Sequence, residues 1–344
     1  MQLSIDDFLK LRAQLPVVDV RSEGEYQEGH VQAAVNIPIL NNAERVEVGT
    51  DYKRKGQAEA IKTGFRLVGP RLLNIINETE RVGNELLVHC WRGGMRSSNF
   101  CQFVGMAKIK THQLAGGYKA YRTRALESFM LPLELVVVSG CTGSGKSEML
   151  RALKAHGEQV IDLEQLASHK GSVFGGLSMP PQPTTEQFQN DLFENILKLD
   201  RLRRVWIEDE SIAVGKIFLP EGLWRQMNES PIVEIVVDRA VRIQRLVEEY
   251  GPADREQFLE AMTRITKKLG GQHFNAARDK LLTNDMPAVI DILLTYYDKA
   301  YTNGLSKKKH RVKASVAWNG SNLQSFAGNL SQAVNQLFRG KLTL

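Results

Sequence analysis

Ten residues from His89 to Ser98, HCWRGGMRSS, combine residue types that could bind and attack an anion. The thiol of Cys90 is followed by a glycine pair, and the guanidinium of Arg96 stands six positions after the thiol. Inward backbone N–H groups and a guanidinium together form a cradle for a negatively charged oxygen group. The spacing therefore predicts an anion-binding loop with a nucleophilic sulfur at its floor, in which Cys90 and Arg96 are the expected catalytic residues.

The length of this loop indicates the size of its anion. The five residues between the cysteine and Arg96 are Trp91, Arg92, Gly93, Gly94 and Met95, which gives the C-x₅-R spacing also found in protein tyrosine phosphatases. A loop of this width can enclose a tetrahedral anion of phosphate size. We expect Arg96 and the loop from Trp91 to Met95 to hold such an anion, and whether Arg92 points inward stays open.

A second anion site is predicted where the apolar run LVVV enters the loop SGCTGSGKS. The sequence satisfies G-x-x-x-x-G-K-[ST] in the strand, loop and helix context that this motif requires. Loop N–H groups would hold a di- or triphosphate, Lys146 would bridge its oxygens, and Ser147 would reach a Mg²⁺ ion if one is present. The expected diphosphate-binding residues are Gly140, Thr142, Gly143, Ser144, Gly145, Lys146 and Ser147.

An acidic strand end further along the chain is a candidate partner for this loop. The segment RRVWIEDES is an apolar strand that ends in Glu208 and Asp209. In phosphate-loop enzymes an acidic residue in such a place orients the metal ion. We expect Glu208 or Asp209 in that role, and an acidic strand end without a metal is the alternative.

Both loops need strands and helices to position them. Residues 17–20 and 85–90 are predicted as short buried strands, and helical spacing follows the cysteine loop. Cys90 would thus lie at a helix N-terminus, which favours both a thiolate and a bound anion. Strands and helices then alternate as in a parallel α/β domain, and the chain becomes mostly helical from about residue 239. We predict an α/β protein with three parts: residues 1–128 with the cysteine loop, a phosphate-loop domain at 129–240, and a mainly helical part at 241–344 packed on it.

Composition narrows the class of protein. The 344 residues are 42% hydrophobic and 24% charged, with only three cysteines and no zinc-ligand spacing, so neither a disulfide framework nor a structural metal is indicated. No apolar run approaches the roughly 20 residues of a membrane span, and the N-terminus lacks signal-peptide features, so a cytoplasmic protein is expected. The net charge of +6 favours a polyanionic partner. The basic runs at 201–204, 267–268 and 307–311 could contact phosphates or could equally be solvated.

The first third of the chain resembles the rhodanese family. The segment VVDVRSEGEYQEGHVQAAVNIP places Asp19, Arg21, Glu25, Tyr26, Gly29, His30, Ala34, Asn36 and Pro38 where that family has them, and LAGGYKAYR resembles its closing motif. The resemblance covers about residues 4–125 and implies that Cys90 is the cysteine that takes a sulfur or selenium atom from a donor. We expect structural roles for His30 and His89, a buried and unreactive Cys101, and no chemistry at Cys141.

Six further strings, in their order along the chain, resemble the tRNA 2-selenouridine synthase family. They are AERVEVGTDYKRKGQ, HCWRGGMRS, GCTGSGKSEML, VIDLEQLASHKGSVFGG, WIEDES and LGGQHF. The resemblance runs from Val17 to about Phe274 and implies replacement of the sulfur of 2-thiouridine, at the wobble position of tRNA, by selenium from selenophosphate. It also implies geranylation of the same sulfur by geranyl diphosphate, which would make the sulfur a better leaving group.

The resemblance assigns roles to the two loops. Cys90 would handle the selenium, the cysteine loop with Arg96 would hold selenophosphate, and the phosphate loop would hold geranyl diphosphate, with no tightly bound cofactor. Two alternatives stay open for His169, Lys170 and Ser172: contact with the diphosphate or a tRNA loop, or a structural turn. The expected partners are a tRNA with 2-thiouridine at the wobble position, selenophosphate and geranyl diphosphate. The sequence leaves open whether Cys90 forms a covalent selenium adduct and whether a nucleotide binds at the phosphate loop. It also leaves open the oligomeric state, the tRNAs used, and whether the active site is shared by the two loops or separate.

Three other functions compete with this interpretation. A phosphate-loop kinase or NTPase that uses ATP or GTP, regulated by an idle rhodanese-like module, would leave Cys90 and Arg96 unexplained. A phosphatase would explain the C-x₅-R spacing but would need a general acid, and the sequence shows no convincing one. A tRNA-binding adaptor would need neither loop.

Overall fold

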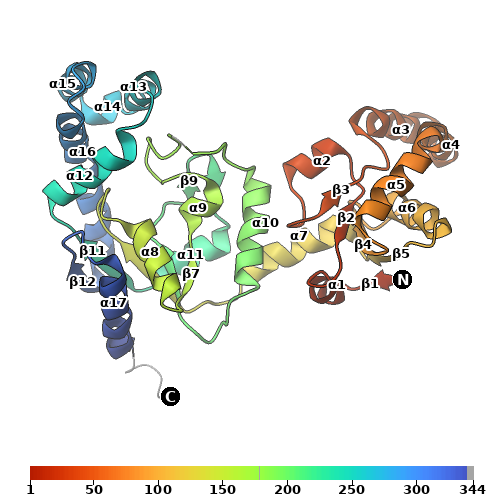
Figure 1. Cartoon of the computed structure of the whole chain (residues 1–344), viewed down its shortest axis with the longest axis horizontal. Helices are drawn as coiled ribbons and strands as arrows, with labels where there is room; N and C mark the ends of the chain where they lie inside the picture. Colours follow the sequence, from red (N-terminus) through yellow and green to blue (C-terminus); the bar gives the residue numbers. More distant parts are fainter. Residues whose placement is uncertain (178, 339–344) are drawn as a thin grey trace. The chain divides into compact units, whose positions relative to one another are not determined.

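The computed structural model describes residues 1–177 and 179–338, which fall into two compact units (Figure 1). The first unit comprises Met1–Ser128 together with the short segment Gln189–Glu194. The second comprises Phe129–Phe188 and the chain from Asn195 onward. Each unit is built on one five-stranded sheet in which all the strands are parallel. The predicted fold class, with two parallel α/β units, is therefore confirmed.

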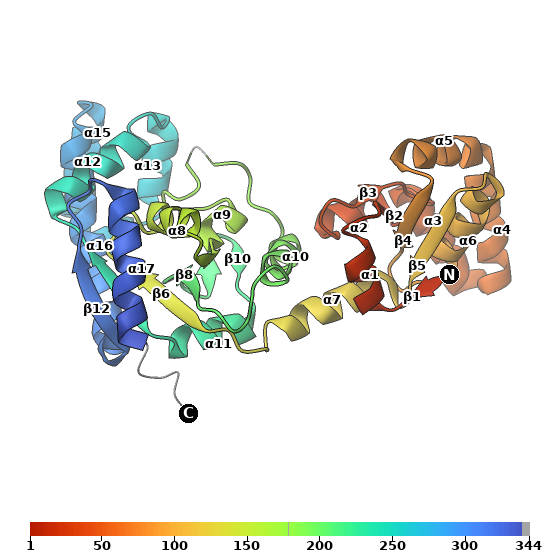
Figure 2. The same cartoon turned by 60° about the horizontal axis from the view of Figure 1, so that its bottom comes forward.

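The sheet of the first unit has the strand order β1-β5-β4-β2-β3, so β4 is its middle strand. Its strands are β1 (Gln2–Leu3), β2 (Val17–Asp19), β3 (Val35–Asn36), β4 (Glu85–His89) and β5 (Lys110–Leu114). Its helices are α1 (Ile5–Leu11), α2 (Glu23–Glu28), α3 (Asn42–Lys55), α4 (Gln57–Val68), α5 (Leu72–Val82), α6 (Met95–Met106) and α7 (Gly117–Ser128), with a 3₁₀ turn at Gly69–Arg71. In Figure 2, α3 to α6 lie on one side of this sheet and α1 and α7 on the other. Helices on both faces bury β4 on both sides, which explains why it reads as a continuous apolar run.

The sheet of the second unit has the order β12-β11-β6-β8-β7, so β6 is its middle strand. The strands are β6 (Leu135–Ser139), β7 (Gln159–Ile161), β8 (Val205–Glu208), β11 (Ile232–Val236) and β12 (Val312–Ala317), and a small hairpin is formed by β9 (Ala213–Val214) and β10 (Ile217–Phe218). The helices up to the last crossover are α8 (Lys146–Ala155), α9 (Leu163–Ala167), α10 (Thr185–Ile196), α11 (Glu221–Glu229) and α12 (Arg239–Tyr250). Both predicted loops thus follow the middle strand of a parallel sheet, at the carboxyl edge where ligands bind in such folds.

The C-terminal part of the second unit is mainly helical and has a core of its own. Its elements are α13 (Arg255–Thr263), α14 (Thr266–Leu269), α15 (Gly271–Leu282), α16 (Met286–Lys308), a 3₁₀ turn (Lys309–Arg311) and α17 (Leu323–Phe338). Phe258, Met262 and Val289 are buried in this core together with Leu246 of α12. The sequence did not predict β12, which returns to the edge of the sheet with alternating partly buried and exposed residues. Helix α17 then packs beside α8 (Figure 2).

The described helices include none that combines the length and the apolar character needed to cross a bilayer.

Candidate active site

The cysteine loop is closed by direct backbone contact with the glycine pair that begins α7. The N–H of Tyr118 donates to the carbonyl oxygen of Cys90 over 2.8 Å, and the N–H of Lys119 donates to that of Trp91 over 2.9 Å. A Cβ added to Gly117 would lie 2.3 Å from the Cys90 carbonyl oxygen, and Gly117 has a φ of +59°. Only glycine permits this approach and this backbone conformation together. The closing Gly-Gly motif therefore fixes the shape of the cysteine loop.

Cys90 is buried at the base of this loop, next to the first turn of α6. The residue is 3% exposed, and its sulfur is 3.1 Å from the hydroxyl oxygen of Ser97. Ser97 accepts a hydrogen bond from the amide of Gln113 over 2.8 Å, and that amide also donates to the carbonyl of Gly93. The Ser97 proton is then available for the carbonyl oxygen of Gly94 or for a thiolate on Cys90. Ser97 and Gln113 were not among the predicted site residues; the signal for Ser97 is its place directly after Arg96.

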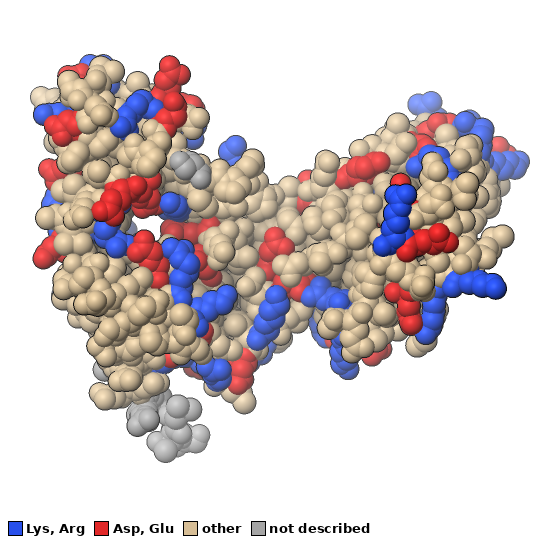
Figure 3. All heavy atoms as spheres, viewed as in Figure 1, with Lys and Arg blue, Asp and Glu red and all other residues tan. Residues whose placement is uncertain are grey.

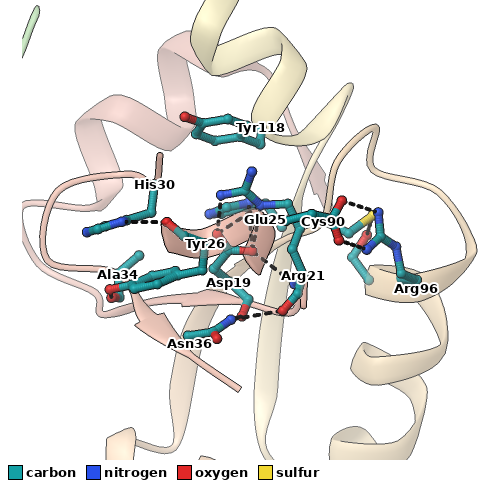
Figure 4. Close-up of polar contacts among 12 residues, drawn as sticks. Asp19, Arg21, Glu25, Tyr26, His30, Ala34, Asn36, Cys90, Arg96 and Tyr118 are labelled. Atoms are coloured by element: carbon teal, nitrogen blue, oxygen red, sulfur yellow. Dashed lines mark hydrogen bonds and ion pairs between the residues drawn. The ribbon is translucent and has the colours of Figure 1, made fainter. Parts of the chain in front are cut away.

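Arg96 lies in the first turn of α6, and its guanidinium faces the carboxylate of Glu25 (Figure 4). The two groups form a bidentate pair with N···O distances of 2.6 and 3.2 Å. Glu25 also pairs with Arg45 over 3.0 Å and accepts the backbone N–H of Ser22. Burial raises the pKa of Glu25, but the contacts with Arg96, Ser22 and Arg45 together hold the pKa below its usual value. An anion in the loop would therefore meet an arginine whose orientation Glu25 already fixes.

The other residues of the rhodanese signature build a buried support beside the loop (Figure 4). Arg21 pairs with Asp19 over 2.6 Å, donates to the carbonyl of Gly29, and lies 3.7 Å from the ring centre of Tyr118. The amide of Asn36 donates to the carbonyls of Asp19 and Arg21 over 2.9 Å each. These contacts are structural: they fix the carboxyl end of β2 next to β4.

Both histidines of this region have structural surroundings. His30 stacks on Tyr26, with 3.9 Å between the ring centres, and its Nδ1 lies 2.9 Å from the Tyr26 carbonyl oxygen. His89 is completely buried, and burial lowers its pKa even though Asp19 opposes the shift. A neutral imidazole in the sheet interior fits the structural role expected for His89.

The remaining cysteines lie away from this chemistry. Cys101, which we expected to be buried, is partly buried and packs against the core of the first unit, where burial raises its pKa. Cys141 lies in the phosphate loop, and burial raises its pKa as well. Raised pKa values disfavour the thiolate form at both positions.

The phosphate loop has the backbone conformation that its motif predicts. Gly143 and Gly145 have φ values of +82° and +79°, and α8 begins directly behind them at Lys146. The ammonium of Lys146 donates to the carbonyl of Gly140 over 3.1 Å, so it curls over the loop. A Cβ on Gly140 would lie 2.5 Å from the Ser144 hydroxyl oxygen, which is buried and has no hydrogen-bond partner among the described residues. The loop thus leads into a helix N-terminus, a place that favours a bound anion.

The acidic residues around this loop include Glu208 and Asp209, whose expected role at a metal ion stays a prediction. The hydroxyl of Ser147 donates to the carboxylate of Glu164 on α9. Glu208 accepts the backbone N–H of Glu164 over 2.8 Å and is completely buried, and this burial raises its pKa well above the usual value. Asp209 is paired with Lys308 over 2.7 Å and accepts the hydroxyl of Ser139. Glu164 is therefore the carboxylate in contact with the motif serine.

A second carboxylate missed by the sequence reasoning, Glu210, lies beside Glu164. A Cβ on Gly171 would be 2.7 Å from one Glu210 oxygen and 3.1 Å from one Glu164 oxygen. Burial and the neighbouring Glu164 raise the pKa of Glu210 to about 8, although Lys146 opposes the shift. Oxygen ligands of this kind suit a magnesium ion. Among the described residues, however, no group of three or more His, Cys, Asp or Glu side chains is arranged as a metal site.

The segment with His169, Lys170 and Ser172 forms a compact turn over these two carboxylates. Lys170 donates its N–H to the carbonyl of Gly175 over 2.9 Å, and its ammonium pairs with Glu249 over 2.6 Å. The hydroxyl of Ser172 accepts the N–H of Phe174 over 3.2 Å. Burial lowers the pKa of His169. These contacts describe a structural turn beside the phosphate loop, and a substrate contact at these residues stays a prediction.

The basic runs are used largely inside the second unit. Arg204 pairs with Glu158 and lies over the ring of Trp206, and Arg311 donates to the carbonyls of Ser230 and Met227. Lys267 and Lys268 on α14 are exposed. Figure 3 shows basic side chains interspersed with acidic ones on the face in view. The runs at 201–204 and 307–311 therefore spend part of their basic side chains on internal contacts, and 267–268 is the one of the three in which every basic side chain is exposed.

Two family models and many relatives match this chain. Residues 133–327 match the model described as the tRNA 2-selenouridine synthase AAA domain, and residues 4–124 match the rhodanese-like domain. A tRNA 2-selenouridine synthase from Nitrosomonas europaea is 31% identical over 89% of this chain and 94% of its own length. One from Shewanella denitrificans is 32% identical over 89% and 91%. One from Bdellovibrio bacteriovorus is 37% identical over 69% and 64%.

Among solved structures, the chain is similar to an N-terminal domain from Clostridium difficile 630 whose parent protein is described as binding ATP or GTP. That domain is 40% identical, covers 37% of this chain and 99% of its own, and has a TM-score of 0.35.

Proposed function

Because this chain belongs to the tRNA 2-selenouridine synthase family, we propose that it is a transferase that replaces the sulfur of wobble 2-thiouridine in tRNA by selenium. The observation that carries the proposal is the place of the cysteine loop and the phosphate loop, each at the carboxyl end of the middle strand of a parallel sheet. One loop has a thiol at its base and the other has a lysine over it, so they suit two different phosphate-bearing substrates. Selenophosphate and geranyl diphosphate are the two substrates we assign.

The phosphate loop would bind geranyl diphosphate and support the first step. The thiocarbonyl sulfur of the uridine attacks C1 of the geranyl group, the C–O bond breaks, pyrophosphate leaves, and the uracil N3 proton passes to water. Lys146 and the loop N–H groups would hold the charge that develops on the leaving pyrophosphate. If a magnesium ion takes part, Ser147 and Glu164 would hold it, and it would supply further charge neutralisation at the diphosphate.

The cysteine loop would bind selenophosphate for the second step. The selenium atom of selenophosphate is already reduced, so its transfer to Cys90 as a selenylsulfide would need a two-electron oxidant that neither substrate supplies. A redox-neutral route fits the C-x₅-R loop better. The Cys90 thiolate attacks phosphorus, the P–Se bond breaks, and hydrogen selenide anion leaves. Hydrogen selenide is far more acidic than an alcohol, so this leaving group needs no general acid.

The released selenide completes the exchange at the base. It attacks C2 of the S-geranylated uridine and passes its proton to N3, the C2–S bond breaks, and geranylthiolate leaves and takes a proton from water. Water then hydrolyses the phosphocysteine to phosphate and Cys90, with the Ser97 hydroxyl 3.1 Å away to donate to the departing sulfur. No electron is gained or lost in the sequence.

The test is mass spectrometry of the nucleosides from an anticodon stem-loop that carries 2-thiouridine, incubated with the protein, selenophosphate and geranyl diphosphate. We expect 2-selenouridine from the wild-type protein and S-geranyl-2-thiouridine when selenophosphate is withheld. Unchanged 2-thiouridine, with folded protein and fresh substrates, would overturn the proposal. Turnover of ATP or GTP that is indifferent to RNA would then favour a nucleotide-dependent enzyme.

A further inference from the structure

An apolar pocket of about 150 Å³ opens in the first unit beside the cysteine loop. It lies among α3, α4 and α6 and the segment before α3, and its walls include Leu40, Val48, Ala60, Ile61 and Phe103. Almost all of the surface that it presents is apolar. Exposure of apolar surface to water is unfavourable in free energy. An apolar ligand that filled this pocket would therefore be stabilised by removing that surface from water.

The pocket shares Arg96 with the predicted selenophosphate-binding loop. Met95 and Arg96 both line it, and both belong to the first turn of α6, directly behind the loop that starts at Cys90. Arg96 is held at this place by the two hydrogen bonds to Glu25. Arg96 therefore borders both the predicted anion loop and the apolar pocket.

Large apolar side chains around the pocket are unusually accessible. Tyr52, Phe65 and Met95 line it and are 58%, 57% and 47% exposed. They belong to three different helices, α3, α4 and α6, and all three line this pocket. An apolar ligand larger than the pocket would have these exposed side chains to cover.

We propose that this pocket binds the terpenyl chain of the S-geranylated uridine while selenium replaces the sulfur. The proposal rests on the function proposed above, in which a ten-carbon chain is attached to the sulfur that must leave. A cavity of about this volume accommodates a benzene molecule. A ten-carbon chain would therefore fill the pocket and extend through its mouth, where its sulfur would lie near Arg96 and the selenium donor.

This assignment explains how one enzyme could favour the geranylated base over the unmodified one in the second step. Each buried methylene contributes about a fourfold gain in affinity. A chain anchored in the pocket would hold C2 of the base at the cysteine loop, and a base without the chain would lack that anchor. The pocket is then a specificity site for the leaving group.

Gly64 offers a clean way to fill the pocket. It lines the pocket from α4, and a Cβ built on it meets nothing within 4 Å. Gly64→Leu would therefore add a branched side chain at the wall of the pocket, with no clash at its Cβ. Gly49→Leu is the control, because Gly49 is also helical and free of neighbours within 4 Å, is exposed, and is not part of the pocket.

The experiment supplies anticodon stem-loops that already carry S-geranyl- or S-methyl-2-thiouridine and follows formation of 2-selenouridine from selenophosphate. We expect the wild-type protein and Gly49→Leu to convert the S-geranyl substrate at least tenfold faster than the S-methyl substrate. Gly64→Leu should lose this preference, with a higher KM for the S-geranyl substrate and an unchanged rate on the S-methyl substrate.

Three results would overturn the assignment. Equal rates on both substrates by the wild-type protein would show that no chain site is used, and a parallel loss of both rates in Gly64→Leu would indicate general damage to the cysteine loop. If the wild-type protein makes 2-selenouridine from neither substrate, the proposed function itself fails and the pocket assignment fails with it. Thermal unfolding of both variants identifies loss of folding, and Ala60→Leu provides a second pocket-filling variant in that case.

Discussion

The hydroxyl oxygen of Ser97 lies 3.1 Å from the sulfur of Cys90, and the amide of Gln113 holds that hydroxyl in place from the other side. The serine sits on α6 and the cysteine directly after β4, so the loop between them sets the distance. A hydroxyl in this position can donate a hydrogen bond to the sulfur when the sulfur bears a negative charge. It is thus placed to assist the departure of Cys90 from a phosphocysteine.

Ser97→Ala should slow the hydrolysis of that phosphocysteine more than its formation. We expect selenation to fall by about 100-fold, the lower end of the range typical of one positioned proton donor. Intact-protein mass spectrometry during turnover should then show a phosphorylated Cys90 that the wild-type protein does not accumulate. Ser97→Thr should retain most of the activity. Adduct-free protein with a normal rate in Ser97→Ala would remove Ser97 from the mechanism.

Gly117→Ala should destabilise the first unit and abolish selenation. The new Cβ would lie 2.3 Å from the Cys90 carbonyl oxygen at a φ of +59°, so both the cysteine loop and the start of α7 would have to move. We expect a loss of roughly 2–4 kcal/mol in the free energy of unfolding, measured by chemical denaturation. Gly105→Ala on α6 is the control, since its Cβ meets nothing within 4 Å. Equal stability of the two variants would contradict the close-contact argument.

The pH dependence of stability should carry a contribution from Glu210. Its pKa is raised to about 8 in the folded protein, so between about pH 4.5 and pH 8 the folded state binds a proton that the unfolded state has lost. The contribution of this group to stability therefore falls as the pH rises through that range. Glu210→Gln removes the effect, so its advantage over the wild-type protein in free energy of unfolding should grow from pH 5 to pH 8.

The control for this titration is Glu229→Gln, because Glu229 is exposed on α11. Denaturant unfolding at pH 5, 6, 7 and 8 gives the comparison. A Glu210→Gln curve that runs parallel to the wild-type curve would show that Glu210 is ionised in the folded protein.

The carboxylate that serves the phosphate loop can be identified by substitution. Glu164 contacts Ser147, whereas Asp209 is neutralised by Lys308. We expect Glu164→Gln to raise the Mg²⁺ concentration needed for half-maximal geranyl transfer by about tenfold. Asp209→Asn should change it by less than about threefold. The reverse order would restore Asp209, one of the two carboxylates that the sequence offered, as the metal partner.

The sequence was sufficient to predict both loops and the strands before them. Each loop is local: its residues are adjacent in the chain, and glycine, lysine and cysteine appear at fixed spacings. What it did not predict are partners from distant segments. Glu25 lies 71 residues before Arg96, and Gln113 lies 16 residues after Ser97. Such pairs depend on the order of strands in the sheet, which local spacing does not encode.

The acidic residues of the second unit likewise depend on partners from distant segments. The strand end WIEDES was recognised, but which of its carboxylates faces the phosphate loop depends on the side chains that compete for each one. Lys308, on a helix 99 residues away, takes Asp209, and the backbone of Glu164 takes Glu208. The edge strand β12 was missed because its six residues alternate weakly, with lysine and serine among them.

The central claim is that the two loops perform successive steps on one uridine, and a bypass experiment tests it most directly. A stem-loop that already carries S-geranyl-2-thiouridine is given to Lys146→Ala and to Cys90→Ala with selenophosphate, and the nucleosides are measured by mass spectrometry. We expect Lys146→Ala, inactive on 2-thiouridine, to form 2-selenouridine from the geranylated substrate at close to the wild-type rate, while Cys90→Ala forms none. Normal selenation by Cys90→Ala, or no rescue of Lys146→Ala, would contradict the division of labour between the loops.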